Sequence, residues 1–482
     1  MNLDADACYR VLRARDRRFD GVFFVAVTTT GIYCRPICPA RTPGRDRVRF
    51  FARAAECERE GFRACFRCRP EVAPGKGAAA VDAKSALVRA ALSKIEDGCL
   101  NEQSLEDLAK SLDVSSRHLR RSIEAEVGVS PVLLAQTRRL ALAKQLLHDT
   151  RLPMAEIAHA SGFASVRRFN SLVRARFGRP PTALRKEHGT KSSDGTFALR
   201  LDYRPPFDWE HLLEFLGDRA TTGIERVERG KYFRAVAIDG EVHTVAVEND
   251  EERSRIVAHV PAALAPKTME ISARLRHLFD LDARPSVIEE VLLHDPMLAP
   301  RVKKQRGTRV PGAFDPFEIA LRTVLGQQVT VKGATTLASR LVKAFGTNVD
   351  PKSEIGWIFP APERVASASI ASIRALGMPE SRAKTIQGVA RAVADGVLDL
   401  SAGADPEHAA RVMTSIHGVG NFTSHVVAMR ALRWADAFPA SDLGVRKALG
   451  STSTKELERK SEAWRPWRAY AVIHLWRNHH GG

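Results

Sequence analysis

The sequence predicts a multidomain, mainly α-helical protein with smaller α+β parts, and three observations support this. The chain has 482 residues, which is too long for a single hydrophobic core. Two stretches rich in small or polar residues, 71–83 and 187–196, lack apolar periodicity and are typical of linkers. The apolar spacing between these breaks changes from short strand-like stretches to long helical patterns. We therefore expect four domains, over residues 1–75, 84–188, 197–283 and 284–482.

The charge of the chain favours a polyanionic partner. Lys and Arg number 74 against 56 Asp and Glu, which gives a net charge of +18 and a pI near 9.9. Cations that contact phosphates release counterions, so such a surface suits nucleic acid, although a basic surface that only confers solubility is the alternative. Because no apolar run reaches membrane-spanning length and the N-terminus lacks a secretory pattern, we expect a cytoplasmic, nucleoid-associated protein without a membrane partner.

The first expected domain carries two cysteine pairs, with Cys34 and Cys38 in GIYCRPICPARTP and Cys65 and Cys68 in FRACFRCRPE. Thiolates are preferred zinc ligands, and pairs with these short spacings can close a tetrahedral site around one ion. Strand-like stretches at 22–27 and 48–51 fit a small domain stapled by metal. The sequence therefore predicts one Zn²⁺ bound by four cysteines.

Basic residues surround the first cysteine pair, which adds a chemical interpretation to the structural one. The cations of this stretch are Arg35, Arg41, Arg45, Arg47 and Arg49. A zinc-bound thiolate beside cations stays nucleophilic at neutral pH, and the same cations would hold a phosphate backbone near the sulfur. A purely structural zinc site, the commoner role of four cysteines, is the alternative.

The segment resembles the N-terminal domain of the Ada adaptive-response proteins, through FDGVFFVAVTTTGIYCRPICPARTP, VRFF and GFRACFRCRPE. The resemblance implies stoichiometric transfer of a methyl group from a DNA methylphosphotriester to Cys34, with Cys38, Cys65 and Cys68 as the other zinc ligands. It also implies tighter DNA binding after methylation, because the site loses negative charge. The Pro-Cys-His-Arg sequence of the Ada C-terminal methyltransferase is missing, so direct reversal of guanine O6-methylation is not expected.

The second expected domain contains two helix-turn-helix patterns, at 104–127 and 154–177. Ser115 or Ser116 in the first, and Ser165 in the second, are candidate N-caps of a basic second helix. Such a helix presents cations where a recognition helix meets the major groove. The candidate DNA contacts are Arg117, Arg120, Arg167 and Arg168.

IAHASGFASVRRFNSLVRARFGRPPTALRK resembles the AraC-type DNA-binding domain. This resemblance implies sequence-specific regulation, with promoter DNA and RNA polymerase as partners. The alternative is a helical packing domain whose basic face is merely solvated.

The C-terminal half begins with strand-like alternation in FALRLDY and YFRAVAI and is expected to be almost wholly helical after residue 284. Gly418 and Gly420 flank Val419 in a turn that enters an apolar helix, where backbone amides can bind a phosphate. Asp442 begins a further helix, and an aspartate there is usually an N-cap. A carboxylate near a bound nucleotide can also stabilise the oxocarbenium-like sugar that forms as a glycosidic bond breaks, and both roles are compatible.

Residues 197–482 resemble the AlkA branch of the helix-hairpin-helix DNA glycosylases, from LRLDYRPPFDW through RVPGAFDPFEIALRTVLGQQVTV to WRPWRAYAVIHLW. The resemblance implies base flipping and hydrolysis of the N-glycosidic bond of alkylated purines such as 3-methyladenine. It makes Asp442 the catalytic carboxylate and 416–421 the hairpin. Gln328 matches the residue wedged into the duplex, while Gln327 is either a second candidate or a structural amide. Phe422 and Trp476 match aromatic positions of the base pocket, or are simply core.

Three positions depart from the family pattern: Phe422 is a smaller ring than tryptophan, Val426 replaces a tyrosine, and His417 stands where proline is common. A transcriptional regulator with an inactive glycosylase-like half is therefore the alternative function, whereas Asp442 and the glycine hairpin favour an enzyme. Phe422 also replaces the lysine of glycosylase-lyases, so water should be the nucleophile and an abasic site the product. No cysteine follows Cys99, which excludes an iron–sulfur cluster in this half.

Overall fold

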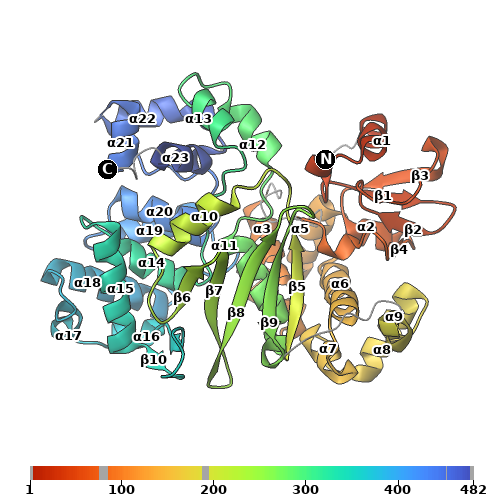
Figure 1. The fold of residues 1–482 in the computed structure, drawn as a ribbon, viewed down its shortest axis with the longest axis horizontal. Coiled ribbons are helices and arrows are strands. Elements are labelled where there is room, and N and C mark those ends of the chain that lie inside the picture. The colour runs from red at the N-terminus through yellow and green to blue at the C-terminus, as the bar shows by residue number, and fades with distance from the viewer. Residues whose placement is uncertain (1–3, 75–84, 187–194, 452, 478–482) are drawn as a thin grey trace. The chain divides into compact units, whose positions relative to one another are not determined.

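The computed structural model describes residues 4–74, 85–186, 195–451 and 453–477 (Figure 1). The chain divides into two compact units. The first comprises Met1–Pro205, Asn249–Arg276 and Leu281–Ala283, and the second comprises Pro206–Glu248, His277–Asp280 and Arg284–Gly482. Most of the two expected linkers, 71–83 and 187–196, lies outside the described residues.

The first unit begins with a small sheet, whose strand order is β3-β1-β2-β4. The expected strand stretches at 22–27 and 48–51 are confirmed as β1 and β3, and β1 runs antiparallel to both β2 and β3. A small core of Cys8, Leu12, Phe23, Val25 and Val48 packs helix α1 on this sheet. The elements are α1 (Ala5–Ala14), β1 (Phe24–Val27), β2 (Ile32–Cys34), β3 (Val48–Phe51), α2 (Ala54–Arg59) and β4 (Arg63–Ala64).

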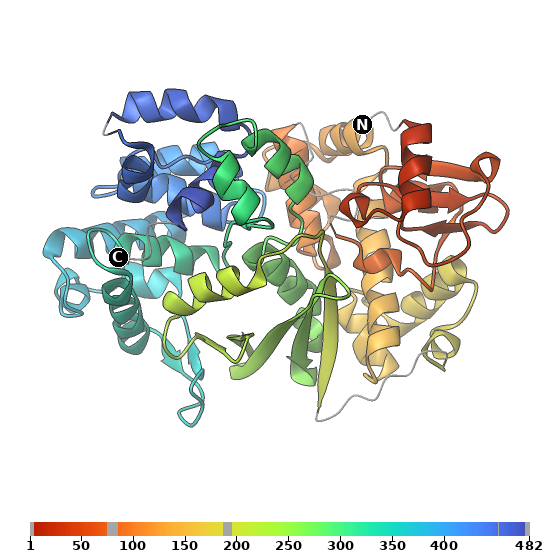
Figure 2. The ribbon, with the colours of Figure 1, turned by 45° about the horizontal axis from the view of Figure 1, so that its top comes forward.

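Among the described residues, seven α-helices follow, and residues 85–186 are coloured from orange to yellow in Figure 2. The two expected helix-turn-helix units are α4–α5 and α7–α8. Ser115 is the N-cap of α5 and accepts a 3.2 Å hydrogen bond from His118 N, so Ser116 is already helical. Ser165 caps α8 in the same way. The helices are α3 (Ala86–Glu96), α4 (Leu105–Lys110), α5 (Ser116–Val127), α6 (Pro131–Asp149), α7 (Met154–Ala160), α8 (Val166–Phe177) and α9 (Pro181–Lys186).

The first unit also contains strands β5 (Thr196–Asp202) and β9 (Arg255–Pro261), which pair antiparallel with Leu199 opposite Ala258. Most of helix α11 (Thr268–Leu278) belongs to this unit as well. Alternate side chains of both strands are buried, as the sequence alternation in FALRLDY predicts. Helices and strands distant in sequence therefore share one compact unit with the cysteine-bearing sheet.

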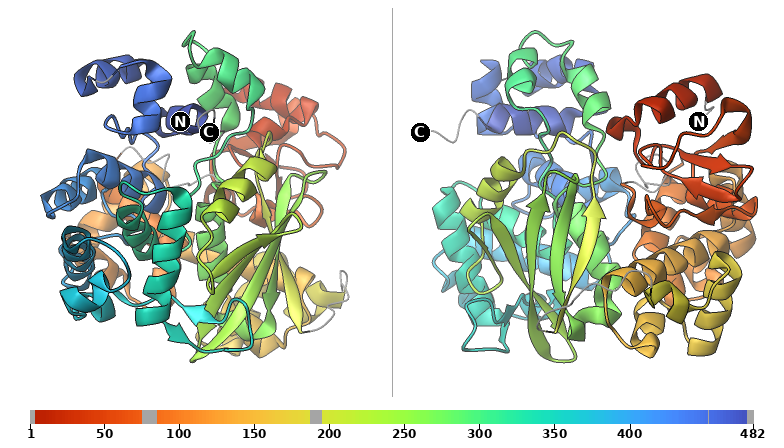
Figure 3. Two further views of the ribbon diagram at one scale, coloured as in Figure 1. Left: turned by 60° about the vertical axis from the view of Figure 1, so that its left-hand side comes forward. Right: turned by 45° about the vertical axis from the view of Figure 1, so that its right-hand side comes forward.

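The second unit combines an antiparallel meander with helices (Figure 3). Its strands are β6 (Glu225–Glu228), β7 (Lys231–Ile238) and β8 (Glu241–Asp250), and β7 is the predicted YFRAVAI strand. Buried ion pairs fix this meander to α14: Glu318 accepts from Arg234 at 2.5 Å and from Arg322 at 2.7 Å. Burial of these charges is tolerated because each has an opposite partner.

The region after residue 284 is almost wholly helical, as predicted, apart from the two-residue strands β10 (Thr347–Asn348) and β11 (Trp357–Ile358). Its core includes Leu321, Leu341, Ile386, Met413 and Val427. Among the described residues, no helix has both the length and the apolar character needed to cross a bilayer. The second unit contains helix α10 (Trp209–Asp218) before this region. The helices after residue 284 are α12 (Pro285–Leu292), α13 (Ala299–Lys304), α14 (Pro316–Leu325), α15 (Val331–Phe345), α16 (Pro362–Ala366), α17 (Ile370–Arg374), α18 (Glu380–Ala394), α19 (Pro406–Ser415), α20 (Asn421–Ala431), α21 (Leu443–Leu449), α22 (Thr454–Ser461) and α23 (Arg468–Trp476).

Candidate functional site

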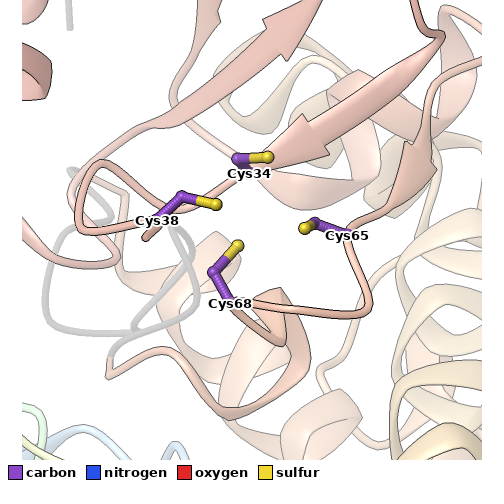
Figure 4. A group of neighbouring side chains, drawn as sticks. All are labelled: Cys34, Cys38, Cys65 and Cys68. Atoms are coloured by element: carbon purple, nitrogen blue, oxygen red, sulfur yellow. The ribbon is translucent and has the colours of Figure 1, made fainter. Parts of the chain in front are cut away.

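The four predicted zinc ligands converge because of the strand pairing. Cys34 ends β2 and Cys65 directly follows β4, and these strands are parallel with Tyr33 opposite Ala64. Turns then bring back the second cysteine of each pair, so that all four Sγ atoms lie within 4.8 Å of one another (Figure 4). A tetrahedral zinc ion with Zn–S bonds of about 2.3 Å needs sulfur atoms about 3.8 Å apart. The donor set and its spacing fit one Zn²⁺.

Cys34 differs from the other three cysteines in exposure. Cys38, Cys65 and Cys68 are buried, whereas Cys34 is half-buried. The backbone N–H of Arg35 donates a 3.3 Å hydrogen bond to the sulfur of Cys68. All four sulfur ligands are nevertheless buried, so the role of Cys34 as the acceptor stays a prediction.

Arg35 does not face a phosphate, contrary to the expectation from the sequence. Its guanidinium is 4% exposed, with Nε donating to Asp20 at 2.8 Å and Nη1 donating to Asp202 at 2.8 Å. Burial alone would lower the pKa of Arg35, but the two carboxylates raise it above its usual value. This arginine anchors the cysteine loop to β5. It cannot bind DNA.

The other four arginines near Cys34 also divide into two kinds. Arg45 pairs with Asp6, Arg47 with Asp46, and Arg49 with Glu60, all as surface ion pairs. Of the five arginines, Arg41 alone lines a groove beside Cys34. The predicted basic environment is therefore only partly formed by the residues that the sequence suggested.

The groove beside Cys34 has a volume of about 620 Å³, and four arginines line it. Arg41 was expected, whereas Arg63, Arg67 and Arg179 were not. Arg63 precedes the second cysteine pair and Arg67 lies between its two cysteines, so a survey of cations around both pairs would have found them. Arg179 is too distant in sequence for any such signal. The apolar lining includes Leu12, Val25, Val27, Ile32 and Phe66, and no carboxylate occurs among the lining residues that the structure describes.

The second cysteine pair is tied to helix α6 by a buried lysine. Nζ of Lys144 donates to the carbonyl of Cys65 at 2.9 Å and to Glu71 at 2.9 Å, and both side chains are almost fully buried. The ammonium also lies 4.8 Å from the centre of the Phe66 ring. These contacts join the zinc ligands to the helix-turn-helix region, in addition to the covalent connection along the chain.

The predicted DNA-contacting arginines lie on the open faces of α5 and α8. Both helices bury an apolar face, formed by Leu119, Ile123 and Val127 in α5 and by Phe169, Val173 and Phe177 in α8. The opposite faces carry the exposed side chains of Arg117, Arg120, Arg167 and Arg168. This arrangement suits two recognition helices, although the contacts themselves stay a prediction.

The predicted hairpin, 416–421, lies between α19 and α20, and its two glycines differ. Gly418 has φ +82°, and a Cβ there would lie 2.1 Å from Oγ1 of Thr385. Gly420 has φ −103° and no heavy atom within 4 Å of such a Cβ. The fold therefore requires glycine at 418, whereas at 420 only an external molecule would meet an added methyl group.

The structure separates the roles of the two glutamines. Nε2 of Gln327 donates to the carbonyl of Gly418 at 3.0 Å and to Oγ1 of Thr423 at 2.9 Å, so this amide fixes the hairpin to the end of α14. Gln328 is exposed and has φ +54°, a left-handed conformation that costs a non-glycine residue about 1–2 kcal/mol. Gln327 therefore has a structural role. The role of Gln328 as the residue wedged into the duplex stays a prediction.

Asp442 is the N-cap of α21, as predicted, and it also meets one of the expected pocket aromatics. Its Oδ1 accepts hydrogen bonds of 2.8 Å from Val445 N and of 2.8 Å from the indole Nε1–H of Trp476. Gly444 packs tightly here, since a Cβ on it would lie 3.1 Å from Asp442 Oδ1. Phe422 lies half-buried on the first turn of α20, and its pocket role stays a prediction.

The loop that carries Asp442 is anchored by His425, a residue outside the motifs recognised in the sequence. Its Nδ1 accepts a 3.1 Å hydrogen bond from Phe438 N, and its ring stacks on Trp434 at 5.2 Å between centroids. Burial first, and then the Arg468 cation, lower the pKa of His425 to about 4, so the ring is neutral at pH 7. The sequence could have indicated His425, because it follows the predicted pocket residue Phe422 by three positions, which is about one helical turn.

Family models match four successive stretches of the chain. They are the "Metal binding domain of Ada" over 7–71, a "Helix-turn-helix domain" over 108–187, the "AlkA N-terminal domain" over 198–315 and the "HhH-GPD superfamily base excision DNA repair protein" over 321–468. These four matches follow one another along the chain without overlap.

Three curated relatives cover different parts of the chain. A protein of Mycobacterium tuberculosis described as "Probable bifunctional transcriptional activator/DNA repair enzyme AlkA" is 40% identical over 99% of this chain and 97% of its own length. "DNA-3-methyladenine glycosylase 2" of Escherichia coli is 32% identical over 57% of this chain and 95% of its own. "Bifunctional transcriptional activator/DNA repair enzyme Ada" of Escherichia coli is 37% identical over 30% of this chain and 39% of its own.

Proposed function

Because this chain belongs to the family of bifunctional transcriptional activators and DNA repair enzymes named AlkA, we propose that it removes alkylated purines from DNA and also accepts methyl groups from the DNA backbone. The observation that carries the first activity is Asp442, held at a helix N-terminus and bonded to Trp476. An inactive glycosylase-like half has no need of this oriented carboxylate, which favours the enzyme over a regulator alone.

In the glycosylase half, the hairpin binds the backbone beside the lesion while the damaged nucleotide is flipped out of the duplex. Gln328, exposed on its strained turn, fills the gap in the base stack. Asp442 stabilises the positive charge that develops on the sugar as the N-glycosidic bond breaks, and water completes the hydrolysis. Trp476 orients the carboxylate through Nε1–H and offers an aromatic face that suits a cationic base such as 3-methyladenine. Phe422 is the proposed second aromatic side of this pocket.

The excision assay compares Asp442→Asn with the wild type, using duplex DNA that contains 3-methyladenine. Asparagine keeps an oxygen that can cap Val445, so the fold should survive while the charge is lost. We expect base release by the wild type and a loss of at least about 1,000-fold in the variant, which corresponds to about 4 kcal/mol of transition-state stabilisation. Equal release by both proteins would refute the catalytic assignment.

At the N-terminal end, we propose that Cys34 takes the methyl group of a DNA methylphosphotriester, with Cys38, Cys65 and Cys68 holding the same Zn²⁺. Bound zinc would keep the four thiols deprotonated, and the sulfur of Cys34 would stay nucleophilic. The groove arginines hold the phosphate beside Cys34 while the sulfur attacks the methyl carbon. Mass spectrometry of peptides after incubation with methylated DNA should find one added methyl, on Cys34. A methyl on another cysteine, or none, leaves a structural zinc site only.

We also propose a regulatory role that uses the two helix-turn-helix units on promoter DNA, with RNA polymerase as a further partner and the nucleoid as the location. Exposed cations on α5 and α8 support this part. Replacing Arg117 or Arg167 with alanine should lower affinity for the recognised promoter by about tenfold while excision is retained. The proposed division into domains is 1–75, 84–188, 197–283 and 284–482.

A further inference from the structure

The groove beside Cys34 is built from two regions that are distant in sequence. One side comes from the cysteine-bearing sheet and its loops, which supply Cys34, Arg41, Arg63 and Arg67. The other side comes from the end of the second helix-turn-helix unit, where 177–179 closes helix α8. Gly178 ends this helix in the left-handed conformation, with φ +70° and its N–H bonded to the carbonyl of Arg174, and the exposed Arg179 follows.

A single buried carboxylate fixes the two sides of the groove to each other. Glu58, whose side chain is 4% exposed, accepts a 3.0 Å hydrogen bond from the hydroxyl of Tyr33 and a further one from Thr137, and it forms an ion pair with Arg176. Tyr33 directly precedes Cys34, and Arg176 lies three residues before Arg179. The acceptor cysteine and the wall formed by 177–179 are thus held by the same group.

An aromatic contact next to the second cysteine pair also joins the two sides of the groove. Phe66 follows the zinc ligand Cys65, and its ring lies 6.2 Å from that of Phe177. Phe177 is buried and Phe66 is half-buried. The wall is therefore part of a packed interface within the first unit, and Arg179 lines the groove next to this packing.

The chemistry of the lining matches a phosphate that carries an alkyl group. Four arginines surround the groove, and none of the described residues that line it is a carboxylate, which favours an anion. Apolar side chains such as Leu12, Val25 and Ile32 line its remainder and accommodate carbon-bound hydrogens better than water. The neutral phosphotriester gains a full negative charge during methyl transfer, so cations in the groove bind the departing phosphodiester more strongly than the substrate.

We propose that Arg179, from the second helix-turn-helix unit, binds the phosphate of the methylphosphotriester and positions it for attack by Cys34. This inference rests on the proposed methyl transfer. In the reaction the sulfur of the Cys34 thiolate forms a bond to the methyl carbon, and the bond from that carbon to the phosphate oxygen breaks. Both electrons of the broken bond leave on the phosphodiester oxygen, so the sulfur becomes a neutral thioether and the phosphate becomes an anion. Arg179 stabilises the charge on that anion. The second helix-turn-helix unit is thus part of the damage-sensing site as well as a DNA reader.

The test measures single-turnover methyl transfer in the full-length zinc-loaded protein. The substrate is a single-stranded trinucleotide with one methylphosphotriester, which is too short for a duplex groove and isolates the contacts near Cys34. Arg179→Ala should lower the maximal transfer rate constant by about 10- to 100-fold, the range expected for a lost charged hydrogen bond. Arg179→Lys should restore part of the rate, because it returns the charge without the planar fork. Arg13→Ala removes an equally exposed cation beside the groove residue Leu12 and should change nothing.

Zinc content and excision of 3-methyladenine show whether Arg179→Ala is folded, and both should equal those of the wild type. A wild-type rate in Arg179→Ala overturns the inference and leaves the methyl-acceptor function intact. A rate that falls on long duplex DNA but not on the trinucleotide also overturns it, because Arg179 would then serve duplex binding in general. If the wild type itself gains no methyl on Cys34, the proposed function fails and the inference fails with it.

Discussion

The two hairpin glycines predict opposite outcomes for the same substitution. In Gly418→Ala, the residue must keep φ near +82°, which costs about 1–2 kcal/mol for an L-amino acid. Its Cβ would also lie 2.1 Å from Thr385 Oγ1 and displace that hydroxyl from the carbonyl of His417, a hydrogen bond of 2.9 Å. Loss of this bond adds about 0.5–1.5 kcal/mol, so we expect destabilisation of about 2–3 kcal/mol in total.

Gly420→Ala should stabilise the DNA-free protein, whereas Gly418→Ala destabilises it. Its φ of −103° suits any residue and its surroundings are open, so alanine mainly restricts the unfolded chain and stabilises by about 0.4–1 kcal/mol. In the complex, however, the same methyl group stands where a backbone phosphate must approach the amides that begin α20. We therefore expect at least tenfold weaker binding of DNA that contains an abasic-site analogue.

Calorimetry of the full-length protein, combined with fluorescence anisotropy on the abasic-site duplex, checks both expectations. The relevant transition is the one that this duplex shifts upward. For a unit of this size, 1 kcal/mol moves the midpoint by about 2–4 °C, so Gly418→Ala should lower it by about 4–12 °C and Gly420→Ala should raise it slightly. Equal midpoint losses in both variants, or unchanged DNA binding in Gly420→Ala, would contradict the reasoning.

Three further expectations concern the two sites. Trp476→Phe keeps an aromatic face but loses the bond to Asp442, so single-turnover excision should slow by about 10- to 100-fold, and an unchanged rate would show that the indole N–H has no role. His474, buried beside Gln305, has a pKa lowered to about 3 by burial first and then by Arg477, so stability present above pH 6.5 should be lost as the pH falls. At pH 4.5 the loss is about 3 kcal/mol, and the midpoint of His474→Gln should vary less between pH 6.5 and 4.5 than that of the wild type. Removal of zinc by a chelator should abolish methylation of Cys34 and spare excision, since the four ligands belong to the first unit and Asp442 to the second; parallel loss of both activities would argue for coupling between the units.

Local patterns predicted much of this protein because each depends on neighbours in the chain. Ser115 and Ser165 begin helices where a short polar side chain can cap them, and Asp442 does the same for α21. The four cysteines were likewise found from spacing alone, since a chelating pair is a local feature. The alternation that predicted β5 and β7 reflects burial on one face of a strand, which is also a local periodicity.

Local sequence patterns could not predict which partner a charged or polar side chain would have. Arg35 and Arg41 lie in the same basic stretch, yet Arg35 is buried because Asp202, more than 160 residues later, compensates it. The two glutamines are a second case, since only the position of the Gly418 carbonyl makes Gln327 a structural amide and leaves Gln328 exposed. In both cases the decisive partner is brought close by the fold and has no sequence signature.

Arg179 directly follows Gly178, the residue that ends helix α8. A cation at the end of a recognition helix would ordinarily be assigned to the duplex that this helix reads. Here the fold places it in a groove that is also lined by Cys34, the proposed methyl acceptor, and Glu58 contacts Tyr33 and Arg176 close to these two residues in the chain. If Arg179 binds the phosphate during transfer, the phosphodiester anion forms next to the second recognition helix. Methylation of Cys34 then changes the charge felt by a residue of that unit directly, without any rearrangement of the fold.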